Sequence, residues 1–549
     1  MYTHRDEMQE NANEEDPSYH TVLLSTFVIR KKRCRVYFHK GTLIWETERP
    51  PYTRWTLPLT DVLTATYGDD VRVSGLTGTS NEAFRDKEKE SQASAPTSPS
   101  STTPNSPTSF VLHYAAQGAK NKWSHHSVTM NHDDPRQVSS WVKTIRNYLA
   151  NLSHRPRKIL LFVNPFGGKK KGLHIWEKRV QPLMGIAGVE AKVIVTERAG
   201  HIRDVLLNCE LDSYQAAVCV GGDGTFAELF NGLIARTARD QRIDLNDPDV
   251  LLPKPTLPVG VIPSGSTDTL AYSLHGTTDV ETAVIHIVFG DSAGLDVSSV
   301  HNEKNLLRIY ASIFSYGYLG DVIRDSEKFR WMGPQRYDYS GFKKIIANKG
   351  YEGEVVLLSD PGHPAACERC TKNCARCIEI SHNGTVDDDK RLTVRGKFFM
   401  VNGANISCAC SKSPMGFSPH CHIGDGCVDV ILVRHTSLIN NIRMLFRLSS
   451  KDKTLYDLPF VEVYRAREFT FKASNPGSNQ QQRQQSYENS TTTGPRSNLG
   501  SSALSVWNCD GEVIDASSVK IRAHRQLLKV YTRRMQPEPR PNPSCFCLL

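Results

Sequence analysis

The central part of the chain alternates short apolar runs with glycine-rich turns and stretches of helical periodicity. Four apolar, β-branched runs predict buried strands, at residues 159–163, 191–195, 216–220 and 259–262. Apolar residues recur at helical spacing over 226–234, and residues 202–207 predict a shorter helix. This repeat over residues 157–296 predicts a Rossmann-like parallel α/β domain, whose ligands bind at the carboxyl ends of the strands.

Three of the predicted strands end in loops of small residues, many of them glycine. The loops read Asn164-Pro165-Phe166-Gly167-Gly168, Gly221-Gly222-Asp223-Gly224 and Pro263-Ser264-Gly265-Ser266. Because glycine has no Cβ, its backbone can approach a ligand closely, and the free N–H groups of a helix that follows favour an anion. The three loops therefore predict a phosphate-binding site.

Asp223 lies between the glycines of the second loop. A site that only binds phosphate has no evident need of an acid there, whereas phosphoryl transfer to a hydroxyl needs a group that accepts the hydroxyl proton. We expect Asp223 to be that group, in a loop that faces solvent; the alternative interpretation is a helix-capping aspartate. The Gly-x-x-x-x-Gly-Lys-Ser/Thr motif and the protein-kinase motifs are absent from the sequence.

The first part of the chain predicts a smaller domain over residues 20–150. Strand-like runs at 22–30, 35–46, 110–115 and 123–130 precede apolar residues at helical spacing over 138–149. Strands closed by one helix with a central tryptophan, Trp141, resemble a pleckstrin-homology domain. Residues 1–19 are polar and acidic, and residues 78–109 are rich in Ser, Thr and Pro; we expect both segments to be disordered.

A basic turn joins the first two predicted strands of this domain. Its cationic residues are Lys31, Lys32, Arg33 and Arg35. Such a turn is compatible with a solvated hairpin. It is also compatible with binding to phosphoinositide or another anionic lipid at a membrane surface.

Beyond residue 297 the pattern becomes that of an antiparallel domain, which we place at 297–533. The strand-like runs are 306–314, 353–358, 397–401, 428–433, 461–464, 469–472 and 519–523. They predict a mostly antiparallel β-sandwich. Residues 473–503, rich in Gln, Ser, Asn and Gly, predict a flexible insertion, and residues 534–549 form a Cys-containing tail.

A cluster of cysteines lies within this domain. Cys370, Cys374 and Cys377 can supply thiolate ligands, and Cys-x-x-Cys is a spacing that zinc sites use. Ligands could instead come from a second set, Cys408, Cys410, Cys421 and Cys427 with His420 and His422. A redox-sensitive thiol cluster and plain loop cysteines are further alternatives. The candidate ion is therefore Zn²⁺.

Composition narrows the class of protein. The chain has 549 residues, a net charge of +9 and 14 cysteines. Without a signal-peptide core the cysteines indicate a reducing, cytoplasmic compartment, and no apolar run approaches the roughly 20 residues that span a bilayer. The modest positive charge suits an anionic membrane surface, and no nucleic-acid-binding signature is present. We expect a peripherally membrane-associated protein.

The three loop motifs together resemble those of the diacylglycerol kinase catalytic superfamily, and the resemblance within it is closest to the ceramide kinase family. The pleckstrin-like region, Pro263–Asp268, Asp321, the cysteine cluster and Asp510-Gly511-Glu512 all match. One departure is Asp268, where many relatives carry Asn. The resemblance implies an ATP-dependent lipid kinase that uses Mg²⁺ and phosphorylates the primary hydroxyl of ceramide, at the Golgi or plasma membrane.

The resemblance and the loop pattern together assign candidate residues. Those expected to bind the nucleotide are Asn164, Pro165, Phe166, Gly167, Gly168, Thr196, Glu197, Glu228, Gly265, Ser266, Arg330, Arg336, Asp510, Gly511 and Glu512. Those expected to contact the lipid are Gly221, Gly222, Asp223, Gly224 and Asp321. Sphingosine or diacylglycerol as substrate, a catalytically dead lipid-binding adaptor and an NAD kinase remain alternatives at this point.

Overall fold

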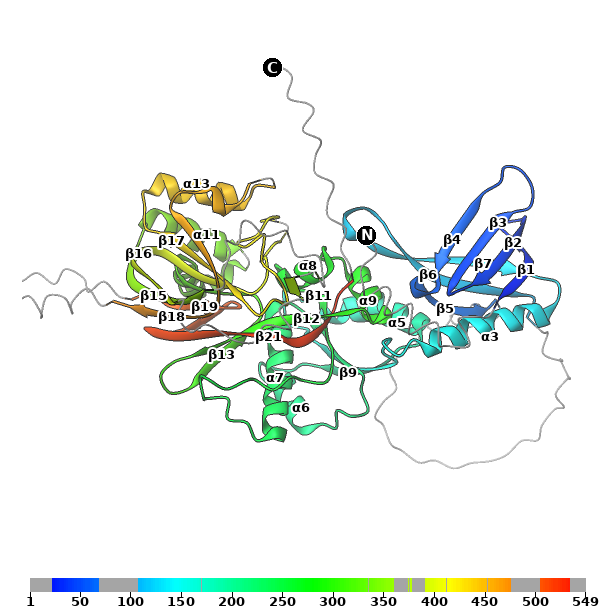
Figure 1. Cartoon of the computed structure of the whole chain (residues 1–549), viewed down its shortest axis with the longest axis horizontal. Coiled ribbons are helices and arrows are strands. Elements are labelled where there is room, and N and C mark those ends of the chain that lie inside the picture. The colour runs from blue at the N-terminus through cyan, green and yellow to red at the C-terminus, as the bar shows by residue number, and fades with distance from the viewer. Residues whose placement is uncertain are drawn as a thin grey trace, which may run out of the picture. The chain divides into compact units, whose positions relative to one another are not determined.

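The computed structural model describes residues 22–68 and 107–533, apart from residues 169, 334, 360–373, 375, 378–390, 411, 452 and 475–503 (Figure 1). The predictions for 1–19 and 534–549, nearly all of those for 78–109 and 473–503, and the one for Cys370 lie outside the described residues. Contacts divide the chain into two compact units, with most of the chain before Arg155 in the first and nearly all of it after Pro156 in the second.

The N-terminal unit is an antiparallel sheet closed by one helix. Its strands are β1 (Leu23–Ile29), β2 (Lys32–His39), β3 (Thr42–Thr47), β4 (Arg54–Pro58), β5 (Val62–Tyr67), β6 (Ser109–Gln117) and β7 (Trp123–Asn131), in the order β4-β3-β2-β1-β7-β6-β5. Helix α3 (Pro135–Asn151) begins where the Asp134 side chain accepts a hydrogen bond from the Arg136 N–H, 2.9 Å away. Trp141 is fully buried against Phe27, so its predicted place in the core is confirmed.

One strand prediction in this unit was wrong. Residues 35–46 do not form a single strand, because Lys40 and Gly41 take positive φ values of 46° and 65° and turn the chain between β2 and β3. The basic turn is likewise tighter than expected: only Arg30 and Lys31 separate β1 from β2, both with positive φ.

The first half of the C-terminal unit is the predicted parallel α/β layer. Strands β8 (Lys158–Val163), β9 (Glu190–Val195), β10 (Ala216–Gly221) and β11 (Val259–Pro263) pair in parallel in the order β11-β10-β8-β9, so all four predicted strands are confirmed. The helices are α4 (Gly172–Ile175), a π-turn at Trp176–Val180, α5 (Gln181–Ala187), α6 (His201–Asn208), α7 (Asp223–Gln241), α8 (Thr269–His275) and α9 (Val280–Phe289). Helices α6 and α7 pack together below the strands in Figure 1, and α8 and α9 pack on β11.

The second half is mostly antiparallel. Its strands are β12 (Ser292–His301), β13 (Leu306–Tyr310), β14 (Ile313–Gly317), β15 (Tyr351–Ser359), β16 (Arg391–Ala404), β17 (Val428–Arg434), β18 (Val461–Ala473), β19 (Trp507–Cys509), β20 (Glu512–Ile514) and β21 (Ser518–Tyr531). Strand β16 pairs with β15 along its first half and with β17 along its second, and β18 changes partner in the same way. Each of these two long strands therefore pairs with both β15 and β17. The predicted fold class is confirmed.

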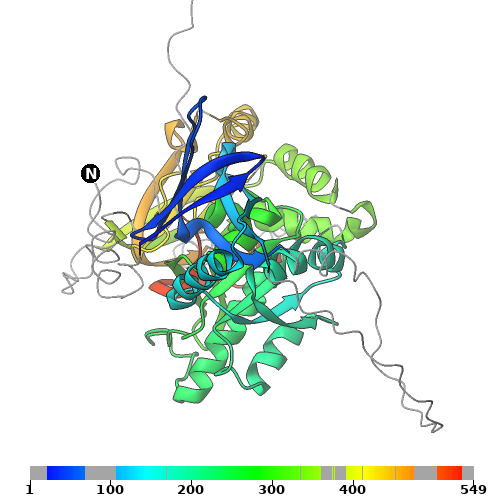
Figure 2. The ribbon, with the colours of Figure 1, turned by 90° about the vertical axis from the view of Figure 1, so that its right-hand side faces the viewer.

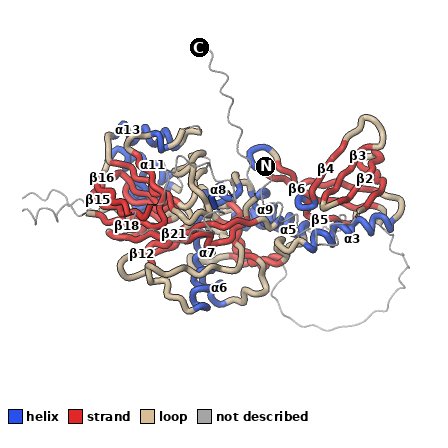
Figure 3. The backbone as a smooth tube through the Cα atoms, viewed as in Figure 1, coloured by secondary structure: helices blue, strands red, loops and turns tan. Residues whose placement is uncertain are grey.

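Two predictions for this half were wrong in detail. Residues 306–314 form two strands that do not pair with each other, since β13 pairs with β12 whereas β14 pairs with β16 and β19. Residues 461–464 and 469–472 are parts of one strand, β18. The pattern also missed the helices α10 (Tyr318–Ser326), α11 (Gln335–Ala347) and α13 (Leu438–Leu448). Figure 3 shows α11 and α13 beside the strands.

Strand β21 joins the two halves of the C-terminal unit. It pairs antiparallel with β12 and β18, and at Val530 it pairs in parallel with Val259 of β11. The parallel and antiparallel strands therefore form one continuous sheet. Figure 2 shows the ribbon of Figure 1 turned by 90°. The edge at which the parallel strands end thus has a fixed place relative to the antiparallel strands.

Candidate active site

The three glycine loops meet backbone to backbone at the carboxyl ends of β8, β10 and β11. Gly168 has a φ of +54°, and a Cβ placed on it would lie 2.6 Å from the Ser264 carbonyl oxygen. A Cβ on Gly265 would lie 2.7 Å from the Cα of Gly222. Real Cβ atoms do not approach this closely, so glycine at these positions is what allows the loops to touch.

Asn164 holds the first loop to the second. Its amide nitrogen donates to the Thr225 hydroxyl at 2.8 Å, and its carbonyl oxygen accepts from the N–H groups of Phe166 and Gly167 at 2.9 and 3.0 Å. Each of these bonds joins two atoms of the protein itself. The predicted role of Asn164 in nucleotide binding is therefore that of a residue that shapes the loop, while Phe166 and Ser266 are exposed beside it.

Asp223 does not lie in a solvent-facing loop as expected. Strand β10 ends at Gly221 and helix α7 begins at Asp223, so Gly222 alone joins them. The Asp223 carboxylate is partly buried and accepts from the N–H groups of Thr269 and Leu270 at 3.0 and 2.9 Å. These are the first residues of α8, so Asp223 caps a different helix from its own. Burial raises the pKa of this carboxyl group, and the two N–H donors counteract the rise.

Gly224 also departs from expectation. It is exposed in the first turn of α7, and a Cβ built on it would meet no protein atom within 4 Å. Substitution of Gly224 therefore meets no obstacle inside the protein. Any requirement for glycine at this position would have to come from a bound ligand.

Two further carboxyl groups lie within electrostatic reach of Asp223. Asp268 accepts from the Gly265 N–H at 2.8 Å, and burial together with the Asp223 charge raises its pKa to about 6. Burial raises the pKa of Asp510 to about 7; its bond from the Ser312 hydroxyl lowers that pKa, and the Asp223 charge adds to the rise. Two acids from distant segments thus lie within electrostatic reach of Asp223. The carboxylate oxygens of the three acids do not all come within 4.8 Å of one another, so they are not a preformed cation site.

The Asp510-Gly511-Glu512 segment is a tight turn. Asp510 and Gly511, with φ values of 50° and 89°, join β19 to β20, and the Glu512 carboxylate pairs with Arg308. The turn brings Asp510 near Asp223, as the electrostatic effect on its pKa indicates. The Glu512 carboxylate, by contrast, is engaged with a neighbouring strand.

The predicted basic pair, Arg330 and Arg336, lies after α10. Both side chains pair with one carboxylate, that of Glu327: Arg330 through Nε at 2.7 Å and Arg336 at 3.7 Å. Arg330 is largely exposed, and Arg336 also stacks on the ring of Tyr337. Each guanidinium therefore has a protein partner that a phosphate would have to replace or share.

Asp321 was expected to grip the lipid headgroup, or else to be a plain turn residue. It lies in the first turn of α10 and is buried, and its carboxylate binds Arg324 at 2.7 Å, the Ser505 hydroxyl at 3.0 Å and the Tyr351 hydroxyl. With three donors already in place, this side chain holds α10 to β15 and to the segment before β19.

The remaining predicted nucleotide residues lie around α6. Thr196 is buried at the end of β9, and Glu197 beside it is exposed. The Glu228 carboxylate accepts from the Ile202 N–H at 2.9 Å, so this side chain supports the start of α6. Ser264 belongs to the third predicted loop, and its buried hydroxyl has no hydrogen-bond partner among the described residues.

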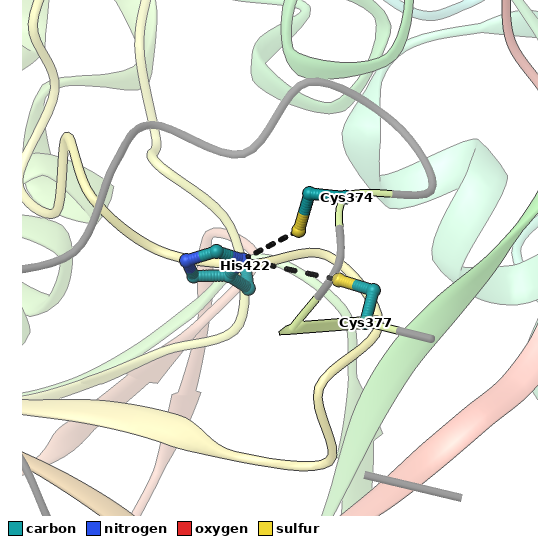
Figure 4. A group of neighbouring side chains, drawn as sticks. All are labelled: Cys374, Cys377 and His422. Carbon is teal, nitrogen blue, oxygen red and sulfur yellow. Dashed lines mark hydrogen bonds between the residues drawn. The ribbon is translucent and has the colours of Figure 1, made fainter. Parts of the chain in front are cut away.

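The described part of the cysteine cluster consists of Cys374, Cys377 and His422 (Figure 4). His422 Nδ1 lies 3.1 Å from the sulfur of Cys374 and 3.9 Å from that of Cys377. The two predicted ligand sets are thus mixed, since His422 comes from the second set. Cys408 and Cys421 of that set instead donate to backbone carbonyls.

Family models match successive parts of the chain. The model "Ceramide kinase PH domain" matches residues 23–145, "Diacylglycerol kinase catalytic domain" matches 158–300, and "Ceramide kinase C-terminal domain" matches 310–548. Together with the glycine-loop site, these matches define a lipid kinase that carries a pleckstrin-homology domain. The predicted enzyme class is confirmed, and no helix among the described residues is long and apolar enough to cross a bilayer.

Similar proteins narrow the class further. "Ceramide kinase" of Homo sapiens is 37% identical over 463 residues, covering 79% of this chain and 84% of that protein. "Ceramide kinase 1" of Caenorhabditis elegans is 30% identical, with 75% and 73% covered, and "Sphingosine kinase 2" of Arabidopsis thaliana is 27% identical, with 61% and 68% covered. The chain therefore belongs to the ceramide kinase family, as the sequence motifs predicted.

We expect the three acids Asp223, Asp268 and Asp510 to bind a divalent cation more tightly as pH rises. Asp268 and Asp510, with pKa values of about 6 and 7, are protonated at low pH and gain two negative charges as pH rises through these values. Folding raises both pKa values above that of a free aspartate, so the folded state binds more protons than the unfolded state between about pH 4 and these values. The unfolding temperature of the cation-free protein should therefore fall as pH rises from about 4 to about 7 and then level off. Thermal unfolding with and without Mg²⁺ between pH 5 and 8 measures both effects.

The Asp510→Asn variant is the control for this expectation. It should flatten the fall in cation-free stability, which we place on the order of 2 kcal/mol, and weaken the stabilisation by Mg²⁺. Parallel pH curves for the variant and the parent protein would contradict the assignment.

Proposed function

We propose that this chain transfers the γ-phosphoryl group of ATP to the primary hydroxyl of ceramide, giving ceramide 1-phosphate and ADP. The observation that carries the proposal is the position of Asp223, whose carboxylate is fixed by the start of α8 at the junction of three glycine loops. The names of the relatives support ceramide as the acceptor. Sphingosine and diacylglycerol are the alternatives, and incubation with labelled ATP, Mg²⁺ and each lipid in turn tests the choice.

In the proposed reaction the lipid hydroxyl oxygen attacks the γ-phosphorus while the bond to the β-phosphate oxygen breaks. Asp223 accepts the hydroxyl proton. A carboxylate has about four lone-pair positions, so the bonds from Thr269 and Leu270 leave room for this proton. Since the transition state of phosphoryl transfer is loose, the proton moves late and a weakly basic carboxylate suffices.

The nucleotide is proposed to lie along the glycine loops, with its phosphates at Gly167, Gly168, Gly222 and Gly265. Asp268 and Asp510 are the residues proposed to hold Mg²⁺, which would supply positive charge to the transferring group when bound. Arg330 and Arg336 would exchange Glu327 for phosphate oxygens. The proposed nucleotide site also includes Thr196, Glu197, Glu228, Gly511 and Glu512. Asp321 positions α10 on the lipid side of the site.

Asp223→Asn should abolish turnover, and it should also lower stability, contrary to what a loop residue would do. The amide nitrogen of Asn must face one of the two N–H donors of α8, and a buried donor without an acceptor costs about 1–3 kcal/mol. Loss of a positioned base slows transfer by a factor of about 10² to 10⁴. Steady-state kinetics and thermal unfolding measure the two effects.

The matched control is Asp240→Asn on the same helix. Asp240 lies at the other end of α7 and pairs with Arg236 at the surface, so its loss should change neither rate nor fold noticeably. Near-normal turnover in Asp223→Asn would refute the proton-acceptor role.

We propose that the enzyme is cytoplasmic and that its N-terminal unit recruits it to an anionic membrane, the Golgi or plasma membrane. The unit would do so by binding phosphoinositide or similar lipids. Lys31, Lys32, Arg33 and Arg35 are all exposed around the β1–β2 turn. Arg33, however, pairs with Glu48 at 3.2 Å, so part of its charge is already balanced. The two lysines should therefore contribute most of the attraction.

Replacement of all four residues by Ala should weaken binding to anionic vesicles by about 1 kcal/mol per charge, with Lys31→Ala plus Lys32→Ala accounting for most of it. Vesicle sedimentation measures this effect. Turnover on ceramide dispersed in detergent should change little. Lys40→Ala, at the turn between β2 and β3, is the control, and equal losses in both assays would speak against a recruitment role.

We also propose a structural Zn²⁺ at Cys374, Cys377 and His422. Ligand atoms of a tetrahedral zinc with bonds of about 2.0–2.3 Å lie roughly 3.3–3.8 Å apart, close to the 3.1 and 3.9 Å found here. The Cys377 carbonyl accepts from Arg525 and Gln526 of β21, so an ion here would fasten this segment to that strand. Cys370 lies outside the described residues and stays a predicted ligand.

Cys374→Ser and Cys377→Ser should each lose activity together with bound zinc, while the control Cys209→Ser at the end of α6 should lose neither. The parent protein should contain about one zinc per chain by elemental analysis, and a strong chelator should reproduce the loss. Fully active protein without zinc would end the metal hypothesis. Peroxide sensitivity that dithiothreitol reverses would then favour a redox role.

The division of the chain follows from these roles. We propose a pleckstrin-homology domain at 20–150, a catalytic α/β domain at 157–296 and an antiparallel domain at 297–533. Strand β12 crosses the boundary at 296, so these last two parts share structure.

A further inference from the structure

Helix α13 is apolar on two opposite faces. Its inner face buries Met444 and packs Leu445 and Leu448 against the core, with Asn441 as a buried polar residue on the same face. The outer face carries Ile439 and Phe446, which are 77% and 76% exposed, with Ile442 between them. Residues three, four and seven apart lie on one side of a helix, so these side chains form a continuous exposed stripe where a surface helix normally carries polar residues.

The neighbouring helix α11 repeats this arrangement. Ser340, Gly341 and Ile345 are buried, whereas Phe342 and Ile346 are 68% and 55% exposed. Tyr339 lies one turn before Phe342 on the same exposed side. Large exposed apolar side chains thus occur on two helices of the same part of the fold.

The two helices are held against each other. The Asn441 side chain of α13 donates to the Asn348 side chain at the end of α11 at 2.6 Å, and the Asn348 amide donates to the Thr436 carbonyl at 3.0 Å. Figure 1 shows α13 and α11 as neighbours at the same end of the unit. Their exposed residues therefore belong to a fixed surface rather than to separate loops.

The charges on this surface are mainly positive. The charged residues of α13 are Arg443 and Arg447, and those of α11 are Arg336, Lys343, Lys344 and Asp338. Arg447 pairs with Asp457, and Arg336 pairs with Glu327. Lys343 and Lys344 share the single carboxylate of Asp325, and Arg443 forms no ion pair among the described residues, so positive charge remains in excess. Arg443 and Lys343 are exposed next to the apolar stripes. Apolar side chains bordered by cations are typical of helices that lie in the interface of an anionic membrane.

We propose that α11 and α13 form a membrane-docking surface of the catalytic unit, with Phe342, Ile346, Ile439 and Phe446 inserted among the lipids and Arg443 and Lys343 at the headgroups. The inference rests on the lipid-kinase function, because a substrate that resides in a bilayer requires the active unit to reach that bilayer. It assigns this contact to the catalytic unit itself, in addition to the basic turn of the N-terminal unit.

A second copy of the chain is the other candidate for covering these helices. In a symmetric dimer the same patch faces itself, so Arg443 and Lys343 of one copy would approach those of the other. Anionic lipid neutralises these cations, whereas a second copy adds to their repulsion. The charges therefore favour the membrane.

The test is vesicle binding by the full chain in high salt. Salt screens the attraction of the basic turn but leaves apolar insertion intact, so the binding that persists reports α11 and α13. Ile439→Gln with Phe446→Gln, and Phe342→Gln with Ile346→Gln, should each weaken this residual binding to phosphatidylserine vesicles about ten-fold. Glutamine favours helices, and the replaced side chains are exposed, so the fold should persist.

Leu251→Gln is the matched control, because Leu251 is 74% exposed but lies outside both helices. Turnover on detergent-dispersed ceramide should be unchanged in all three variants, which separates failure of docking from failure of the proposed activity. Unchanged vesicle binding in the helix variants would overturn the proposal. Sedimentation that shows a dimer broken by Phe446→Gln, with vesicle binding intact, would assign the surface to a second copy instead.

Discussion

The close approach of three backbones at Gly168, Gly222 and Gly265 is the constraint on which the catalytic unit depends. Parallel strands bring their carboxyl ends to one edge, but side chains would keep the loops apart. Without Cβ atoms the loops touch, and this contact sets the start of α8 within hydrogen-bond distance of Asp223. The position of the Asp223 carboxylate is therefore a consequence of backbone packing.

The same packing explains why acids accumulate here. Burial raises the pKa of Asp223, Asp268 and Asp510, and the Asp223 charge adds to the rise at the other two, which is unfavourable for the isolated fold. Each is compensated locally by backbone N–H groups or by a serine hydroxyl. Carboxylates held near one another in this way attract a cation. The fold therefore has an electrostatic cost at the place where we propose that a cation binds.

Local features were predictable from the sequence, and long-range ones were not. Apolar runs predicted strands β8 to β11, and clusters of glycine predicted the loops, because both signals lie in consecutive residues. The capping of α8 by Asp223 joins residues 46 positions apart, and His422 meets Cys374 across 48, so neither leaves a local pattern. Residues 306–314 looked like one strand because propensity does not reveal which partner each half will take.

Strand β21 has a consequence for how the protein is made. During synthesis the parallel strands emerge first, yet the free edge of β11 finds its partner only when Val530 is available, after the rest of the antiparallel half. The nucleotide-binding half of the nascent chain therefore has an unpaired strand edge until β21 has been made. Chains in such a state tend to aggregate through the exposed edge. Its folding is coupled to a strand that is translated only after the antiparallel half, so a ribosome that stalls before Val530 leaves the glycine loops on an unfinished sheet.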